Sequence, residues 1–182
     1  MEKIILAIVG LPGAGKTEIT NYLQKKFGWP KIYFGQAVFD EIANRGLEIN
    51  EQNEKQVRED LRKKHGMAAM AILNIPKIKE LYENSSVIIE SLYSWEEYLE
   101  VKNEFADKFF VLAVYSSPQT RIERLGKRPE RPLTAEQVQS RDIAQIENLH
   151  QAGPIARADF TIINEGAKEE ACKQADNFIA TI

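Results

Sequence analysis

The chain has 182 residues, enough for one well-packed domain with a small lid. Apolar residues make up 43%, charged residues 28%, and the net charge of -3 comes with no basic tract suited to nucleic acid or a membrane surface. Cys172 is the only cysteine, which excludes an internal disulfide, and His65 and His150 lack metal-ligand spacing. No segment has signal-peptide form or membrane-spanning length, so we expect a cytosolic protein.

The chain begins with a buried strand, a phosphate-binding loop and a helix. Residues 3–9 are almost all apolar, as is typical of a parallel strand, and residues 10–17 read GLPGAGKT, which fits the Walker A pattern G-x-x-x-x-G-K-[ST]. Helical spacing of apolar residues follows over residues 17–27. This strand–loop–helix context favours a true nucleotide site over a glycine-rich turn without a ligand.

The Walker A loop predicts ATP and Mg²⁺ as ligands. Its backbone N–H groups surround phosphates, the Lys16 ammonium reaches the β- and γ-phosphates, and the Thr17 hydroxyl binds Mg²⁺. The start of the following helix adds a partial positive charge. The predicted donor contacts of this segment are Gly10, Gly13, Ala14, Gly15, Lys16, Thr17 and Glu18.

Four further strand patterns alternate with helical ones. They cover residues 31–34, 87–89, 109–115 and 160–163. This alternation predicts a three-layer α/β/α P-loop fold with a five-stranded parallel sheet. Ser94 with Glu97 and Thr134 with Gln137 fit capping boxes, Ser117 precedes a first-turn proline, and Gly28 and Gly126 are placed to end helices.

Two insertions interrupt the alternation within a single domain, residues 1–182. Residues 36–84 are mostly helical, and residues 127–150 begin with the basic stretch KRPERP. Ligands of open α/β sheets bind beyond the carboxyl ends of the strands, where both insertions are expected. We therefore interpret residues 36–84 as the acceptor-binding helices and residues 127–150 as a lid.

The arrangement resembles the P-loop nucleoside and nucleotide kinases, most closely the uncharacterised family described as related to dephospho-CoA kinase and to adenylate kinase. The resemblance covers nearly the whole chain. The stretches that carry it are 10–17, Gly35 with 45–47, 61–62 with 65–68, Arg121 with 124–125, 141–142, and 158–159 with 162–166. It implies an ATP- and Mg²⁺-dependent phosphotransferase.

The departures from that family lie on the acceptor and lid sides. Gln36 and Phe39 stand where the family has an aspartate and an arginine, residues 90–94 read ESLYS, with Tyr93, instead of a pattern close to DGIRS, and Arg131 and its neighbours replace two acidic lid residues. Donor binding is thus expected to be retained and the acceptor altered. A nucleoside monophosphate is the least expected acceptor, because its phosphate usually needs an arginine.

Four residues are predicted to act on the transferring group or the metal. Glu90 ends a strand, where it would orient Mg²⁺ through water or accept a proton from an acceptor hydroxyl. Arg128 and Arg141 would stabilise negative charge on the transferring group, together with Lys16. The plainer alternatives are an exposed strand-end carboxylate and solvated surface arginines.

The resemblance further implies contacts to the donor base. Arg121 would stack on the adenine, and the backbone of Asn164 and Gly166 would border it. A simple strand-to-helix turn is the alternative for the last two. Because such contacts are made largely by backbone groups, ATP and GTP both remain open.

Aromatic residues could line the acceptor pocket. These are Tyr33, Phe34, Phe39, Tyr93 and Trp95, for which a core position is the more common alternative. In that region Asp40, Glu41 and Arg45 are better explained as a solvated helix face.

We predict an ATP-dependent small-molecule kinase. Dephospho-CoA, a nucleoside, a nucleotide and a small alcohol all remain open as acceptors, and the sequence carries no signature of oligomeric state. The alternatives are a P-loop ATPase or nucleotide-sensing protein that acts on a protein or RNA partner, and a degenerate protein that binds nucleotide without chemistry.

Overall fold

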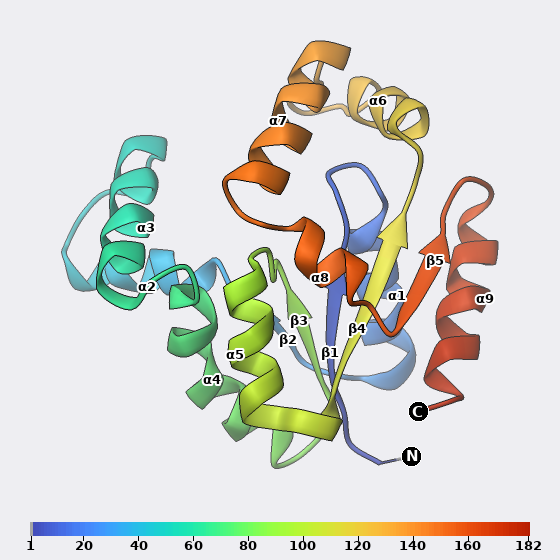
Figure 1. Ribbon diagram of the computed structural model, residues 1–182, viewed down its shortest axis with the longest axis horizontal. Helices are drawn as coiled ribbons and strands as arrows, with labels where there is room; N and C mark the ends of the chain where they lie inside the picture. The colour runs from blue at the N-terminus through green and yellow to red at the C-terminus, as the bar shows by residue number, and fades with distance from the viewer. Residues whose placement is uncertain (1) are drawn as a thin grey trace.

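A twisted parallel sheet forms the centre of the computed structural model, which describes residues 2–182 (Figure 1). The strand order is β2-β3-β1-β4-β5, and every neighbouring pair is parallel, as predicted. The strands are β1 (Ile5–Val9), β2 (Lys31–Tyr33), β3 (Val87–Glu90), β4 (Phe109–Tyr115) and β5 (Phe160–Ile163). All five lie where the apolar runs predicted them.

Alternation of side chains along the strands creates two cores, one on each face of the sheet. In β1, Ile5, Ala7 and Val9 pack toward one face, whereas Leu6 and Ile8 pack toward the other, and all five residues are buried. Both faces must therefore be covered by helices, which explains why this strand is apolar throughout.

The two faces carry different helices. One face packs against α2 (Gln36–Asn44), α3 (Glu51–His65), α4 (Ala69–Tyr82), α5 (Trp95–Phe105) and α8 (Ala152–Ala156). The short 3₁₀ helix η1 (Ala106–Lys108) follows α5, and none of its residues is buried. The other packs against α1 (Lys16–Phe27) and α9 (Lys168–Ile179), where Cys172 is a buried core residue. The remaining helices, α6 (Pro118–Gly126) and α7 (Ala135–Glu147), lie beyond the carboxyl edge of the sheet (Figure 1).

The predicted helix ends are largely confirmed. Ser94 and Thr134 each form a complete capping box, Ser117 caps α6, and Gly28 ends α1 in the left-handed region. Gly126 is the last residue of α6, as predicted, and Lys127 follows it as the C-cap.

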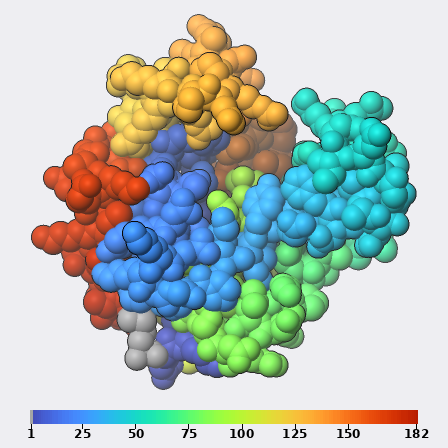
Figure 2. Space-filling view, turned by 180° about the vertical axis from the view of Figure 1, so that it is seen from behind, coloured from blue at the N-terminus to red at the C-terminus, as the bar shows by residue number. Residues whose placement is uncertain are grey.

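The carboxyl ends of the strands face a hollow between the two insertions. In Figure 1 the insertion helices α2 and α3 stand to one side and the lid helix α7 above, and Figure 2 shows the hollow between these segments and the N-terminal part of the chain. Within residues 2–182, no helix combines the length and apolar character that a membrane crossing requires.

Candidate functional site

The Walker A loop connects β1 to α1 through three glycines with positive φ. Gly10, Gly13 and Gly15 have φ values of 142°, 82° and 101°, a range that L side chains rarely adopt. A Cβ on Gly15 would also collide with the side-chain amide of Asn164, and one on Gly10 with the carbonyl of Val114. Glycine is therefore required here by conformation and by space.

The loop presents a set of unused backbone donors. No group in residues 2–182 accepts a hydrogen bond from the N–H of Gly13, Gly15, Lys16 or Thr17. The last two belong to the first turn of α1, whose N–H groups have no partner within the helix. Free donors at a positive helix end suit a phosphate chain, so the loop fits the nucleotide that its sequence predicts.

Lys16 lies within the curve of this loop. Its ammonium donates to the carbonyl oxygens of Gly10 at 2.7 Å and Leu11 at 3.2 Å. Burial lowers the pKa of Lys16 to about 8, the charge of Glu90 opposes this, and Arg128 and Arg121 lower it further. A buried ammonium under such conditions gains stability from a bound anion.

Three buried polar side chains hold the loop in place. Asn164 Nδ2 donates to the carbonyl of Ala14 at 2.7 Å, and Ser116 Oγ donates to the carbonyl of Asn164 at 2.6 Å. Gln151, which is fully buried, donates from Nε2 to the carbonyl of Gly10 at 3.1 Å. Sequence analysis assigned no role to Ser116 or Gln151. Their contacts with the loop, from Ser116 to the carbonyl of Ala14 and from Gln151 to that of Gly10, join residues more than 100 positions apart.

Arg121 has a different environment from the one predicted. It is only 3% exposed, and it forms a bidentate pair with Asp142 of α7 at 2.8 and 2.6 Å. It also donates to the backbone carbonyls of Pro12 and Ser116 at 3.2 Å. With its guanidinium enclosed in this way, Arg121 supports the loop, and the predicted stacking on a donor base does not fit its position.

Arg124 and Arg128 instead face the loop from α6 and the segment after it. Two adjoining cavities, of about 340 and 220 Å³, share Gly15, Glu18 and Arg124 as lining residues. The first is lined by Lys16, Thr17 and Arg128, and the second by Asn164, Gly166 and Lys168, whose ammonium pairs with Glu18. The two cavities therefore form one continuous space beside the Walker A loop.

The two other predicted catalytic residues, Arg141 and Glu90, lie on different elements, α7 and β3. Arg141 is an exposed residue of α7 and lines none of the cavities described in residues 2–182. Glu90 lies at the carboxyl end of β3, beside Ile8 of β1, and forms an ion pair with Lys31 at 2.7 Å. Glu90 is also the register partner of Tyr33 in β2, and its charge raises the pKa of Lys16 against the effect of burial.

A separate cavity, of about 290 Å³, lies at the ends of β2 and β3. Three of the predicted aromatic residues line it, namely Tyr33, Phe39 and Tyr93. Phe34 and Trp95 do not, because Phe34 is fully buried and Trp95 stacks on Tyr98 against the core. The same cavity is lined by Arg58 and Arg62 of α3, for which sequence analysis proposed no role.

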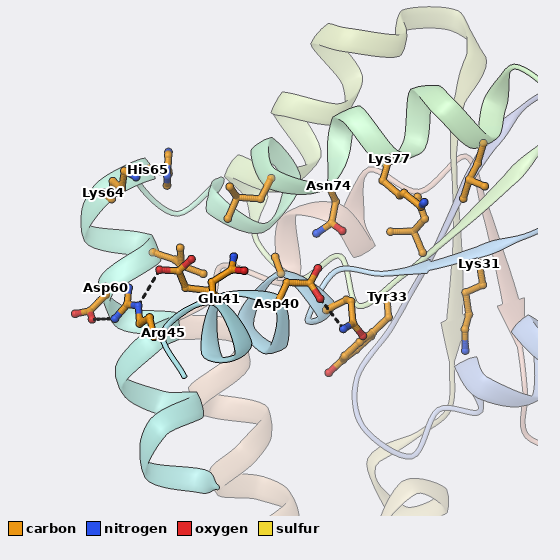
Figure 3. A pocket seen from close by; sticks show the side chains of 17 residues that line it. Lys31, Tyr33, Asp40, Glu41, Arg45, Asp60, Lys64, His65, Asn74 and Lys77 are labelled. Atoms are coloured by element: carbon orange, nitrogen blue, oxygen red, sulfur yellow. Dashed lines mark hydrogen bonds and ion pairs between the residues drawn. The ribbon is translucent and has the colours of Figure 1, made fainter. Parts of the chain in front are cut away.

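A larger cavity of about 650 Å³ is lined by residues of β2, α2, α3 and α4 (Figure 3). Gln36 faces this side, where its amide donates to Asp40 at 2.9 Å. Arg45 pairs with Glu41 at 2.8 Å and with Asp60 at 2.7 Å. The cavity contains no residue of the Walker A loop, and these mutual pairs agree with a solvated helix face.

Comparison with known proteins gives a family from the sequence and a set of solved structures with the same fold. The profile of the family described as AAA domain matches residues 9–146. A UPF0200 protein of Thermococcus gammatolerans is 33% identical and the match covers 98% of this chain and 95% of that protein. Among solved structures, a gluconokinase from Sinorhizobium meliloti aligns over 99% of this chain and 93% of its own, with a TM-score of 0.62 and 13% identity. Shikimate kinase from Bacteroides thetaiotaomicron aligns over 97% and 98%, with a TM-score of 0.61 and 15% identity. The chain therefore shares the fold of these two solved structures, a five-stranded parallel sheet with helices on both faces.

Proposed function

We propose that this chain, which belongs to the AAA domain family and to the UPF0200 proteins, is an ATP- and Mg²⁺-dependent kinase of small molecules. The observation that carries the proposal is the Walker A loop, with four unused N–H donors around a partly buried Lys16. Two solved structures with this fold, a gluconokinase and a shikimate kinase, support it.

Each part of the donor site has a proposed task. The loop and Lys16 bind the phosphates, Thr17 and Glu90 hold Mg²⁺, and Arg124 lies along the base with Asn164 and Gly166 at its edge. Bound Mg²⁺ would neutralise phosphate charge during transfer. Arg128, and Arg141 when the lid of residues 127–150 closes, would add positive charge and exclude water.

The proposed reaction moves one phosphoryl group. A bond forms between an acceptor oxygen and the γ-phosphorus while the bond from that phosphorus to the bridging oxygen of ADP breaks. When the acceptor oxygen belongs to a hydroxyl, its proton passes to the carboxylate of Glu90. The residues 36–84 would hold this acceptor beside the donor site.

The test is ADP release from ATP and Mg²⁺ with a panel of acceptors and a control without acceptor. The expected result is release that depends on an acceptor and is lost in Lys16→Ala. Lys25→Ala is the matched control, because Lys25 is an exposed residue of the same helix. Release that ignores every acceptor would favour an ATPase or nucleotide-sensing protein instead.

A further inference from the structure

The cavity at the ends of β2 and β3 contains two arginines whose charge is poorly balanced. Arg58 and Arg62 are four residues apart and therefore share one face of α3. Within residues 2–182, Arg62 forms no ion pair, and its buried Nε has no hydrogen-bond partner. The contact from Arg58 to Glu54 is a long one of 4.0 Å.

The acidic side chains around this cavity leave the buried Nε of Arg62 without an acceptor. Glu97 is committed to the start of α5, where its Oε2 accepts from the backbone N–H of Tyr93 at 2.7 Å and of Ser94 at 3.0 Å. Glu54 is the other carboxylate in the lining. A buried guanidinium nitrogen without a partner is costly, and an anionic ligand would supply the missing acceptor.

Aromatic side chains also line this cavity. The rings of Tyr33 and Phe39 are stacked with their centroids 6.5 Å apart, and Tyr93 also lines the cavity. The Tyr93 hydroxyl donates to Ser91, whose φ of 67° places a non-glycine residue in the left-handed region at the cavity wall. Such a wall suits the flat or apolar part of a ligand, and a volume of about 290 Å³ restricts that ligand to a small molecule.

We propose that the phosphate acceptor of this protein is a small molecule with a phosphate or carboxylate group next to a flat or apolar body, and that Arg58 and Arg62 bind its anionic group. This inference rests on the proposed kinase function and names its substrate class. It also changes an expectation from the sequence: the arginine that is missing at Phe39 has its counterpart on α3, so nucleoside monophosphates return as candidates.

The experiment compares anionic probes with neutral counterparts. AMP and CMP are set against adenosine and cytidine, and shikimate and gluconate against methyl shikimate and glucose. Binding of each probe is measured by calorimetry on protein saturated with a non-hydrolysable ATP analogue, and turnover is measured as ADP release. The expected result is one anionic probe that binds at least about tenfold more tightly than its neutral counterpart.

Matched variants tie that preference to the two arginines. Arg58→Gln and Arg62→Gln should each weaken the anionic probe about tenfold, with ATP affinity unchanged within about twofold. Lys55→Gln and Lys63→Gln, exposed positions of the same helix outside the cavity, should change neither. Thermal melting of each variant separates loss of binding from loss of folding.

The failures of the two proposals can be distinguished. Protein that binds ATP but binds no anionic probe, prefers the neutral counterparts, or keeps its preference in both arginine variants would overturn this inference alone. Protein that does not bind ATP would overturn the proposed function. The choice between phosphate and carboxylate follows from which pair of probes shows the preference.

Discussion

Arg121 of α6 and Asp142 of α7 face each other in a bidentate pair, with nitrogen–oxygen distances of 2.8 and 2.6 Å. The same guanidinium donates to the carbonyl of Pro12 in the Walker A loop. One buried side chain therefore connects α7, the helix of the proposed lid, to the phosphate-binding loop. The position of α7 and the shape of the loop are expected to depend on each other.

Asp142→Asn should destabilise the protein by roughly 3 kcal/mol, because it leaves the buried Arg121 without a balancing charge. Urea unfolding measures the difference. Glu147→Gln, an exposed position of the same helix, should change the free energy of unfolding by less than about 0.5 kcal/mol. Equal stability of the two variants would show that the pair does not hold the lid.

Arg124→Gln should weaken ATP binding about tenfold without weakening the binding of inorganic triphosphate. The reason is that Arg124, which lines both cavities beside the loop, is proposed to stack its guanidinium on the base, a contact that inorganic triphosphate does not offer. Calorimetry with both ligands makes the comparison, and Lys127→Gln, an exposed neighbour, is the control. An equal loss for both ligands would place Arg124 on the phosphates instead.

Gly15→Ala should abolish ATP binding, because the added Cβ meets the Asn164 amide and the residue has a φ of 101°. Gly28→Ala provides the matched control: its φ of 70° is also positive, but nothing lies within 4 Å of the added Cβ. This second change should cost about 1 kcal/mol of stability and leave ATP affinity unchanged. Retained ATP binding in Gly15→Ala would contradict the packing described for the loop.

ATP affinity should fall about tenfold between pH 7 and pH 9. Because the pKa of Lys16 is lowered to about 8, the free protein loses this proton in that interval, whereas bound phosphates favour the protonated ammonium. Calorimetry in buffers of different ionisation enthalpy should therefore detect proton uptake on binding above pH 8. In Lys16→Met, binding should be weak and this pH dependence absent; a persistent slope would assign it to another group.

The wild-type protein should lose stability as the pH rises from about 4.5 to 7, and Glu97→Gln should remove this loss. Burial raises the pKa of Glu97 to about 7, so in this interval the folded state holds a proton that the unfolded state has released. The contribution of protonated Glu97 to stability is therefore fully present below pH 4.5 and is lost as the pH rises through 7. Glutamine keeps an acceptor for the capping box, and urea unfolding across this range would show an unchanged slope if another group titrates.

The sequence allowed the sheet, the Walker A loop and the caps to be predicted because their signals are local. Strand β4 and the Ser94 capping box need only a few adjacent residues to be recognised. The role of Arg121 could not be assigned in this way. Arg121 and Arg124 lie on one helix, and only the approach of Asp142, 21 residues later, determines which arginine is enclosed.

For Arg58 and Arg62, which line the cavity at the ends of β2 and β3, the signal in the sequence was weaker than for the Walker A loop. Glu54, Arg58 and Arg62 recur every fourth residue along α3, which places them on one face. An exposed charged stripe has the same spacing, so the pattern alone does not distinguish a ligand site from a solvated face. The distinction requires Tyr33 and Tyr93, which the fold brings from β2 and from the segment after β3.

The most direct test of the kinase assignment follows the γ-phosphate of labelled ATP in the presence and absence of AMP, CMP, shikimate and gluconate. The account predicts that the label appears in an organic product only when the acceptor is present, and that Lys16→Ala abolishes its transfer. Label released as inorganic phosphate at the same rate with and without these acceptors would contradict it.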